Sequence, residues 1–232
     1  MLPRILEPEV MDTAAEAADY NAMDHRQVNR CFVDDLLAAL PRAVPPADGI
    51  WRVFDAGTGT ALIPLELAAR EIPIRITAAD AAGHMLRLAQ ENVTRAGRGQ
   101  VIYCVHRDCK HLPEADATFE VVMSNSIIHH IPQPVHVLRE CWRILRPGGL
   151  LFFRDLLRPP DETTLEELVR LYAGEANRHQ RQMFRNSLHA ALTVAEVADL
   201  LDQLGLPTDW VRATSDRHWT ICGVKTESGS PG

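Results

Sequence analysis

The chain has 232 residues, of which 46% are apolar, and a formal net charge of −7. A chain of this length and apolar content forms one packed domain with room for a subdomain, and its acidic balance argues against sequence-independent binding of nucleic acid. No apolar run approaches the roughly 20 residues that cross a bilayer, and the first residues lack the apolar core of a secretory signal. Five cysteines without a CxxC pair indicate free thiols in a reducing compartment. We therefore expect a cytoplasmic protein with no membrane span, no disulfide framework and no metal site.

Residues 1–50 are predicted to be mainly helical. Asp24 and Gln27 have the spacing of a helix capping box. The apolar residues that follow recur every four positions, which places them on one face of a helix; they are Val28, Phe32, Leu36 and Leu40. Pro41 ends this helix, and the Pro- and Gly-containing stretch 45–49 forms a linker.

From Trp51 onward, strands alternate with helices. The predicted strands are 51–55, 74–80, 101–105, 119–124 and 150–153, and the predicted helices are 62–70, 82–96 and 134–145. The sequence Pro147-Gly148-Gly149 is expected to form a sharp turn before the last of these strands. Several strands are almost wholly apolar, a pattern typical of a parallel sheet that helices cover on both faces.

The last third of the chain departs from this alternation. Predicted helices span 161–176, 177–190 and 193–204, and Thr193 with Glu196 makes a capping box for the last one. Two β-like runs, 209–213 and 218–224, are joined by so short a connection that an antiparallel hairpin at the sheet edge is indicated, and 228–232 reads as a frayed tail. The predicted fold class is therefore α/β. It has a doubly wound, mostly parallel seven-stranded sheet with an antiparallel edge hairpin, helices on both faces, and extra N-terminal and inserted helices.

A glycine-rich turn, Asp55-Ala56-Gly57-Thr58-Gly59, follows the first predicted strand. In an open parallel sheet, ligands bind beyond the carboxyl ends of the strands, and glycines let a ligand approach the backbone closely. A dinucleotide site would need a third glycine where Leu62 stands, so this turn does not fit NAD. A carboxylate at Asp55 repels a pyrophosphate but attracts the ammonium group of an amino acid.

Two further acids follow the next two strands. Asp80 ends the second predicted strand, where a carboxylate can accept hydrogen bonds from both hydroxyls of a ribose. Asp108 follows the third strand and could accept a hydrogen bond from the amine of an adenine. The three loops therefore supply partners for an α-amino acid, a ribose and a base.

These segments resemble the class I, Rossmann-like methyltransferases that use S-adenosylmethionine (SAM). Besides the glycine-rich turn, the resemblance rests on Asp80 with Met85 and on the segments 107–113, 116–122, 124–130 and 138–149. It covers about residues 51–155, with Ala61 where a third glycine is commoner in the family. It implies that SAM is the cofactor and that its binding residues are Asp55, Ala56, Gly57, Thr58, Gly59, Asp80, Ala81, Met85, Asp108, Cys109 and Asn125.

The resemblance also implies how the chain is organised. Residues 1–50 would form an N-terminal helical lid, and residues 51–232 a SAM-binding Rossmann-like domain with a helical insertion at about 161–190. The insertion would lie above the carboxyl ends of the strands. A pocket roofed in this way favours a small-molecule methyl acceptor over a macromolecule, and the edge hairpin is a candidate surface for a homodimer.

Candidate catalytic residues lie near the same strand ends. Methyl transfer needs a nucleophile aligned with the breaking C–S bond, and a general base adds about 10²–10⁴-fold where the acceptor carries a proton. His129 and His130 follow the fourth strand, and at most one is expected to face the pocket because neighbouring side chains point differently. His129 is the preferred base, and Tyr20 of the N-terminal segment is a second candidate. The position of Asp155 at the end of the fifth strand can also face the pocket.

Three arginines of the insertion recur at near-helical spacing: Arg178, Arg181 and Arg185. They could bind a carboxylate or phosphate of an anionic acceptor, although a solvated basic face is the simpler interpretation. The sequence predicts a SAM-dependent methyltransferase acting on a small molecule. One alternative keeps the cofactor: a SAM-binding sensor, or an enzyme that modifies SAM itself, would have the same cofactor loops. Another is a nicotinamide-dependent oxidoreductase, which would have to bind NAD without the third glycine.

Overall fold

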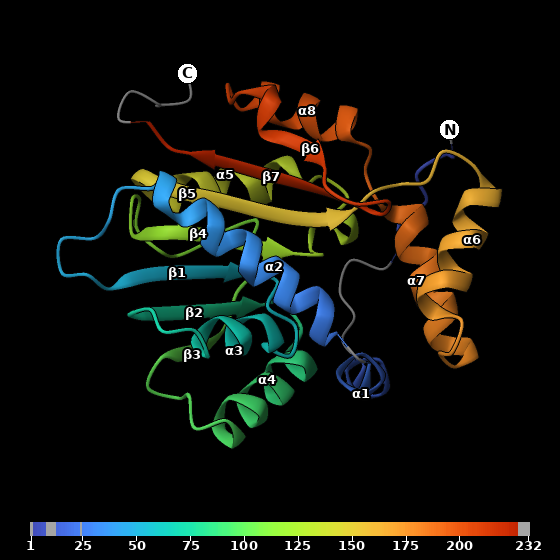
Figure 1. The fold of residues 1–232 in the computed structure, drawn as a ribbon, viewed down its shortest axis with the longest axis horizontal. Helices are drawn as coiled ribbons and strands as arrows, with labels where there is room; N and C mark the ends of the chain where they lie inside the picture. The colour runs from blue at the N-terminus through green and yellow to red at the C-terminus, as the bar shows by residue number, and fades with distance from the viewer. Residues whose placement is uncertain (1, 8–12, 24, 227–232) are drawn as a thin grey trace.

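The sheet has seven strands in the order β3-β2-β1-β4-β5-β7-β6 (Figure 1). The computed structural model describes residues 2–7, 13–23 and 25–226, so Asp24 of the predicted capping box and the tail 228–232 lie outside the described residues. The first five strands are parallel, and β7 runs antiparallel to both β5 and β6. The strands are β1 (Trp51–Ala56), β2 (Ile74–Asp80), β3 (Ile102–His106), β4 (Phe119–Asn125), β5 (Leu145–Leu156), β6 (Val211–Ala213) and β7 (His218–Val224). The predicted fold class and its antiparallel edge hairpin are confirmed.

Helices connect and flank these strands. The α-helices of the described residues are α1 (Ala14–Ala22), α2 (Arg26–Ala39), α3 (Leu62–Ala68), α4 (Gly83–Arg95), α5 (Val135–Ile144), α6 (Glu162–Ala173), α7 (Arg178–Ala190) and α8 (Val194–Gln203). Short 3-10 turns are η1 (Leu40–Arg42), η2 (Ile128–His130) and η3 (Thr208–Trp210). The predicted capping box of Thr193 and Glu196 starts α8, whereas α2 starts at Arg26 behind His25, whose side chain makes no cap hydrogen bond.

Two hydrophobic cores cover the two faces of the sheet. Successive residues of a strand point to opposite faces, so Val53 and Val121 contribute to one core while Phe54 and Val122 contribute to the other. Helices α2, α3 and α4 pack on the first face, and α5 and α8 pack on the second. This double coverage is what the apolar strands predict.

The carboxyl ends of the parallel strands meet a separate group of helices. In Figure 1, α1 and the α6–α7 pair lie beyond the arrowheads of β1, β4 and β5. The α6–α7 pair has its own small core, in which Leu165 and Leu188 pack with Leu156 at the end of β5. The segment 2–7 is fixed to α7, because the amide of Ile5 donates to the carbonyl of His189 at 3.1 Å.

One predicted turn is part of a strand instead. Pro147-Gly148-Gly149 lies inside β5, because its backbone pairs with the chain beyond β7: the Gly148 amide donates to the carbonyl of Lys225 at 2.6 Å, and the Lys225 amide donates to Gly149 at 2.9 Å. The extra residues form a bulge opposite β4, where the register shifts between Phe119 and Val121.

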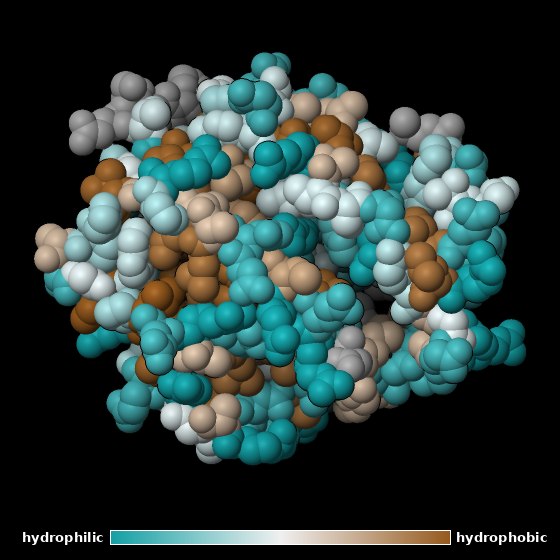
Figure 2. Space-filling view, viewed as in Figure 1, coloured by the Kyte–Doolittle hydropathy of each residue, from teal (hydrophilic) through white to brown (hydrophobic). Residues whose placement is uncertain are grey.

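The molecular surface is mostly polar on the face shown in Figure 2, and it is hollowed where the α6–α7 pair meets the rest of the molecule. Among the residues that the structure describes, no helix is both long enough and apolar enough to cross a membrane.

Candidate active site

The glycine-rich turn leaves β1 in a conformation that favours glycine. Gly57 and Gly59 have φ angles of +73° and +55°, and the amides of Gly57 and Thr58 donate to the carbonyl of Ala79 at 2.9 and 2.8 Å. A Cβ atom on Gly57 would stand 2.8 Å from the side chain of Ile127. The turn is therefore clamped between β2 and the segment after β4, and position 57 admits no larger residue without movement.

Asp55 lies at the end of β1 and is 2% exposed. Burial, helped by the negative charge of Asp80, raises the pKa of Asp55 to about 7. A carboxyl group with such a pKa ionises fully when a cation binds beside it. Its environment therefore suits the ammonium group that the sequence predicts.

Asp80 is the last residue of β2 and is fixed by two loop amides. Its Oδ2 accepts a hydrogen bond from the Gly59 amide at 2.7 Å, and its Oδ1 accepts one from the Ala82 amide at 2.8 Å. These bonds place the carboxylate beside the glycine-rich turn. The two elements that the sequence assigned to the amino acid and the ribose therefore form one unit.

Helix α1 covers this unit. The Cε1 atom of Tyr20 is 3.6 Å from the position that a Cβ on Gly59 would take. Burial and the charges of Asp80 and Asp55 raise the pKa of Tyr20 to about 12, so its phenol is neutral. Asn92 of α4 holds the helix in place by donating hydrogen bonds to Asn21 at 2.9 Å and to the Thr60 carbonyl at 3.1 Å.

Three other predicted cofactor residues surround the turn in different ways. Met85 of α4 is buried in a small cluster with Ala17 and Tyr20, so it forms part of the wall between α1 and α4. Ala56 is buried in the core at the end of β1, and Ala81 is exposed after β2. Met85 therefore lies at the edge of the site, where it packs against α1.

Asp108 and Cys109 occupy the loop after β3. The carboxylate of Asp108 accepts a hydrogen bond from the Lys110 amide at 2.9 Å and pairs with its Nζ at 3.1 Å. Burial opposes ionisation of Asp108, but these contacts outweigh it and lower the pKa. Cys109 is buried next to Gly57, and burial raises the pKa of its thiol to about 12. The thiol is therefore protonated and is no nucleophile.

Asn125, the last residue of β4, has a side-chain oxygen that lacks a hydrogen-bond partner among the described residues. Its Oδ1 atom is buried and finds no partner among the described residues. Such an atom costs about 1–3 kcal/mol unless a donor reaches it, which a bound ligand can supply. Together with the carboxylates of Asp55 and Asp80, this orphaned atom fits a cofactor that carries amino-acid and nucleoside groups, as SAM does.

A buried histidine–carboxylate pair lies at the ends of β4 and β5. Nδ1 of His129 is 2.5 Å from Oδ1 of Asp155, and the two side chains are 3% and 1% exposed. The other oxygen of Asp155 accepts the amide of Ile128 at 2.6 Å. Burial lowers the pKa of His129, but the charge and hydrogen bond of Asp155 outweigh burial and raise it. The same contacts lower the pKa of Asp155 despite its burial.

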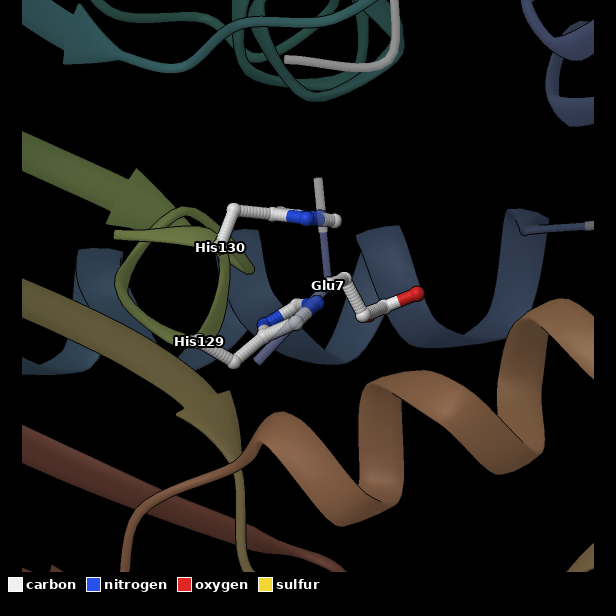
Figure 3. Close-up of side chains that lie close together, drawn as sticks. All are labelled: Glu7, His129 and His130. Atoms are coloured by element: carbon white, nitrogen blue, oxygen red, sulfur yellow. The ribbon is translucent and has the colours of Figure 1, made fainter. Parts of the chain in front are cut away.

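His130 and Glu7 lie beside His129, as Figure 3 shows. The ring centroids of His129 and His130 are 4.0 Å apart, and one ligand-type atom of each histidine and of Glu7 all lie within 4.8 Å of one another. The two rings lie on the same side as Glu7, and the expectation that at most one of them faces the cofactor pocket stays a prediction. The 3-10 turn η2 replaces the alternation of a strand and directs both rings to the same side.

Glu7 reaches the site because the segment 2–7 is tied down by Arg4. The guanidinium of Arg4 donates to the carbonyls of Ala190 at 2.8 Å, Ile131 at 3.0 Å and His129 at 3.3 Å. Sequence reasoning missed Glu7, since a lone acid in a segment without periodicity gives no signal. A contact that spans more than 120 residues can only be found in three dimensions.

The arginines of the insertion have structural partners. Arg185 of α7 forms ion pairs with Glu162 and Glu166 of α6, and Arg181 donates to the carbonyl of Gly174 at 3.2 Å. Two of the three arginines therefore hold the α6–α7 pair together. Binding of an anionic acceptor by this set stays a prediction.

Comparison with known proteins shows similarity to methyltransferases. Residues 54–153 match the family described as "Methyltransferase domain". Over 188 residues, which are 77% of this chain and 66% of its relative, it is 30% identical to malonyl-[acyl-carrier protein] O-methyltransferase of Geobacter sulfurreducens. It is also 30% identical to 27-O-demethylrifamycin SV methyltransferase of Amycolatopsis mediterranei, over 115 residues that are 50% of this chain and 42% of that protein. The chain thus spans 66% and 42% of the lengths of these two curated relatives.

A solved structure has the same fold. A Methanococcus maripaludis protein named as a candidate SAM-dependent methyltransferase superposes with a TM-score of 0.70 at 18% identity, covering 97% of this chain and 99% of that one. The strand order, with an antiparallel β7 between β5 and β6, defines a Rossmann-like fold. With the family match, residues 54–153 form a methyltransferase domain of the class I type, which uses SAM as its cofactor.

Proposed function

We propose that this protein transfers the methyl group of SAM to a small-molecule acceptor that carries an ionisable proton, and that His129 acts on the acceptor. The observation that carries the proposal is the buried His129–Asp155 pair, which lies at the carboxyl ends of β4 and β5. It is next to the cofactor turn, because Ile127, two residues earlier, contacts Gly57. The name of the rifamycin relative, which refers to a small molecule, supports this class of acceptor.

The cofactor half of the site uses the residues around the glycine-rich turn. Bound SAM would supply a methyl group on a positively charged sulfur. Asp55 takes the ammonium group of the cofactor and ionises as it does so. Asp80 takes the ribose hydroxyls, and Asp108 the adenine amine. The buried Oδ1 of Asn125 accepts a further hydrogen bond from the ligand.

The acceptor half uses His129. An ionised carboxylate only accepts hydrogen bonds, so the Nδ1 atom of His129 carries the proton that it shares with Asp155, and Nε2 faces the space shared with Glu7 and His130. There Nε2 takes the proton of the acceptor as the acceptor atom bonds to the methyl carbon. The electron pair of the C–S bond stays on sulfur. The negative charge of Asp155 stabilises the imidazolium that forms.

Tyr20 is proposed to position the cofactor and not to act as a base. Its pKa of about 12 keeps the phenol protonated at neutral pH, and its ring lies over Gly59 on the cofactor side. Residues 1–50 are proposed to act as a lid mainly through α1, because α2 is buried against a face of the sheet. With the α6–α7 pair, α1 roofs the strand ends, which supports a small acceptor.

Two measurements test this function. Titration calorimetry with SAM establishes cofactor binding, and mass spectrometry of an acceptor panel detects the added CH₂ unit. We expect His129→Ala to lower turnover by about 10²–10⁴-fold with little change in SAM affinity. The control is His136→Ala, because His136 lies at the surface of α5 and hydrogen-bonds Gln133. SAM binding without methylation of any acceptor would favour the sensor, and equal turnover of His129→Ala and wild type would return His129 to a structural role.

A further inference from the structure

Three side chains with metal-ligating atoms converge at the acceptor end of the site. They are Glu7 from the N-terminal segment and His129 and His130 from η2, and their ligand atoms lie within 4.8 Å of one another (Figure 3). Two imidazoles and one carboxylate are a set that divalent first-row transition metals accept, Zn²⁺ among them. None of these residues belongs to the cofactor turn.

Two of the atoms in this cluster are buried without a partner. Nδ1 of His130 and Oε1 of Glu7 form no hydrogen bond within the described part of the chain. A buried, unsatisfied polar atom costs about 1–3 kcal/mol, and here two such atoms belong to residues whose ligand atoms lie within 4.8 Å of one another and of a ligand atom of His129. A cation would satisfy all three at once, whereas a single water has fewer favourable partners among three acceptor atoms.

We propose that Glu7, His129 and His130 bind one divalent transition-metal ion, which holds the methyl acceptor next to the cofactor. Three protein ligands leave at least one coordination position open, as in catalytic zinc sites. Zinc–ligand distances of about 2.0–2.2 Å require the ligand atoms to approach one another more closely than 4.8 Å. Glu7 can supply this movement, because it is the one ligand carried by a long, flexible side chain.

Asp155 does not belong to the three proposed ligands but holds one of them, His129, in place. Histidine ligands of metals commonly donate their other ring N–H to a carboxylate, which fixes the ring and raises its basicity. The 2.5 Å contact between Nδ1 of His129 and Asp155 has this arrangement and leaves Nε2 for the ion. Asp155 is itself fixed by the amides of Ile128 at 2.6 Å and Leu156 at 2.6 Å.

The charges at the cluster also suit a cation. Asp155 and Glu7 are acidic, and Arg4 beside them directs its guanidinium to backbone carbonyls.

The binding of the ion does not depend on the proposed function. The role of the ion in methyl transfer does rest on the proposed function. With an ion bound, Nε2 of His129 would be a ligand and no longer the base proposed above, and the ion would lower the pKa of a bound acceptor hydroxyl. The hydroxyl then loses its proton to solvent, its oxygen bonds to the methyl carbon, and the C–S electron pair remains on sulfur. Acceptors with an oxygen group able to bind the ion are the class expected.

The test measures metal binding directly. The full chain is freed of metal with a chelator and titrated with ZnCl₂ by calorimetry, and Co²⁺ is added separately to record its visible spectrum. We expect one tight Zn²⁺ equivalent in the wild type. Glu7→Gln and His130→Ala should each weaken it at least tenfold, while His136→Ala should leave it unchanged. Glu7 and His130 are the cleaner probes of the metal, because His129→Ala also removes the hydrogen-bonding partner of Asp155.

Each result has a defined meaning. Thermal unfolding and SAM titration of every variant show whether fold and cofactor site are intact, so a lost Zn²⁺ equivalent in a folded, SAM-binding Glu7→Gln protein supports the site. No stoichiometric binding by the wild type overturns it. Binding that survives both ligand variants but disappears in Cys31→Ser, where an exposed free thiol is removed, also overturns it. Methyl transfer by chelated, metal-free protein would overturn the metal role and leave the proposed methyltransferase standing.

Discussion

Nδ1 of His129 lies 2.5 Å from a carboxylate oxygen of Asp155, and both side chains are almost fully buried. A buried charge is tolerated only when it is paired and hydrogen-bonded, and Asp155 meets both conditions through His129 and the amides around it. The contact occupies Nδ1 of His129 and leaves Nε2 as its other ring nitrogen. It joins η2, the turn after β4, to the end of the neighbouring strand β5.

Replacing Asp155 by Asn tests this link. Asn keeps the shape but removes the charge that holds the proton on Nδ1, so we expect kcat/KM to fall by about 10–100-fold, the usual effect of losing such a partner. The affinity for SAM should stay within about twofold, because Asp155 contacts η2 and not the glycine-rich turn. Steady-state kinetics and SAM calorimetry measure the two effects. NMR of the histidine ring protons gives a readout that needs no acceptor, and an unchanged Nδ1 proton signal in the variant would contradict the assignment.

Asp80→Ala should weaken SAM binding strongly. The change removes the proposed ribose acceptor and also frees the amides of Gly59 and Ala82 that the carboxylate now binds. Hydrogen bonds to a charged group contribute about 1.5–3 kcal/mol each, so we expect the Kd to rise by about 10–100-fold or more. Calorimetry measures it, and circular dichroism confirms that the sheet is retained. An unchanged Kd would rule out the ribose assignment.

The stability of the SAM-free protein should depend on pH through Asp55. Its folded pKa of about 7 lies above the ordinary value of 3.8. Between these values the folded protein holds a proton that the unfolded chain has lost, so stability falls as pH rises through this window, by up to about 1.4 kcal/mol per pH unit from this residue. Above pH 7 the contribution is constant. Urea unfolding from pH 4 to 8 measures it, with Asp55→Asn as the control that should lack this part of the slope.

The same residue should make SAM affinity depend on pH in the opposite direction. The ammonium group of SAM favours ionised Asp55, so binding should strengthen as pH rises toward 7 and level off above it. In Asp55→Asn the affinity should be weak and almost independent of pH over this range. A wild-type affinity that is flat from pH 5 to 8 would contradict the proposed ammonium contact.

Gly57→Ala has a matched control in Gly49→Ala. Both glycines have nearly the same φ, +73° and +72°, so both substitutions incur a similar backbone strain of about 1–2 kcal/mol. A Cβ on Gly49 meets nothing within 4 Å, whereas one on Gly57 collides with Ile127 at 2.8 Å. We expect Gly57→Ala to be the more destabilising change in thermal unfolding and to weaken SAM binding, while Gly49→Ala leaves SAM binding unchanged. Adding Ile127→Ala should restore part of the loss, and equal effects of the two single changes would exclude the steric explanation.

The sheet and the cofactor half of the site could be predicted from sequence because their signals are local. The alternation of strands and helices predicts strand β2 at its observed bounds, Ile74–Asp80. The glycine-rich turn and Asp80 were likewise recognisable, since each stands directly after a strand. Short-range patterns of this kind reflect backbone geometry, which neighbouring residues determine.

Other features depend on contacts that no local pattern records. Pro147-Gly148-Gly149 has the composition of a turn, yet Lys225 pairs with it and keeps it in β5. Glu7 and His130 are ordinary polar residues until Arg4 brings their segments together. In both cases a tertiary contact overrides or adds to what the local sequence indicates.

The hydrogen bonds of Arg4 have a consequence for how the protein folds. They close loops of 125, 127 and 186 residues, and the entropy lost in closing such loops is recovered only when both partners are already in place. The segment 2–7 therefore docks late, after β4, η2 and α7. It can also open locally while the sheet persists, so the amide of Ile5 should exchange with solvent far sooner than those of β1. Because the glycine-rich turn needs none of these contacts, a partly folded chain acquires the place for SAM before the place for the molecule that receives its methyl group.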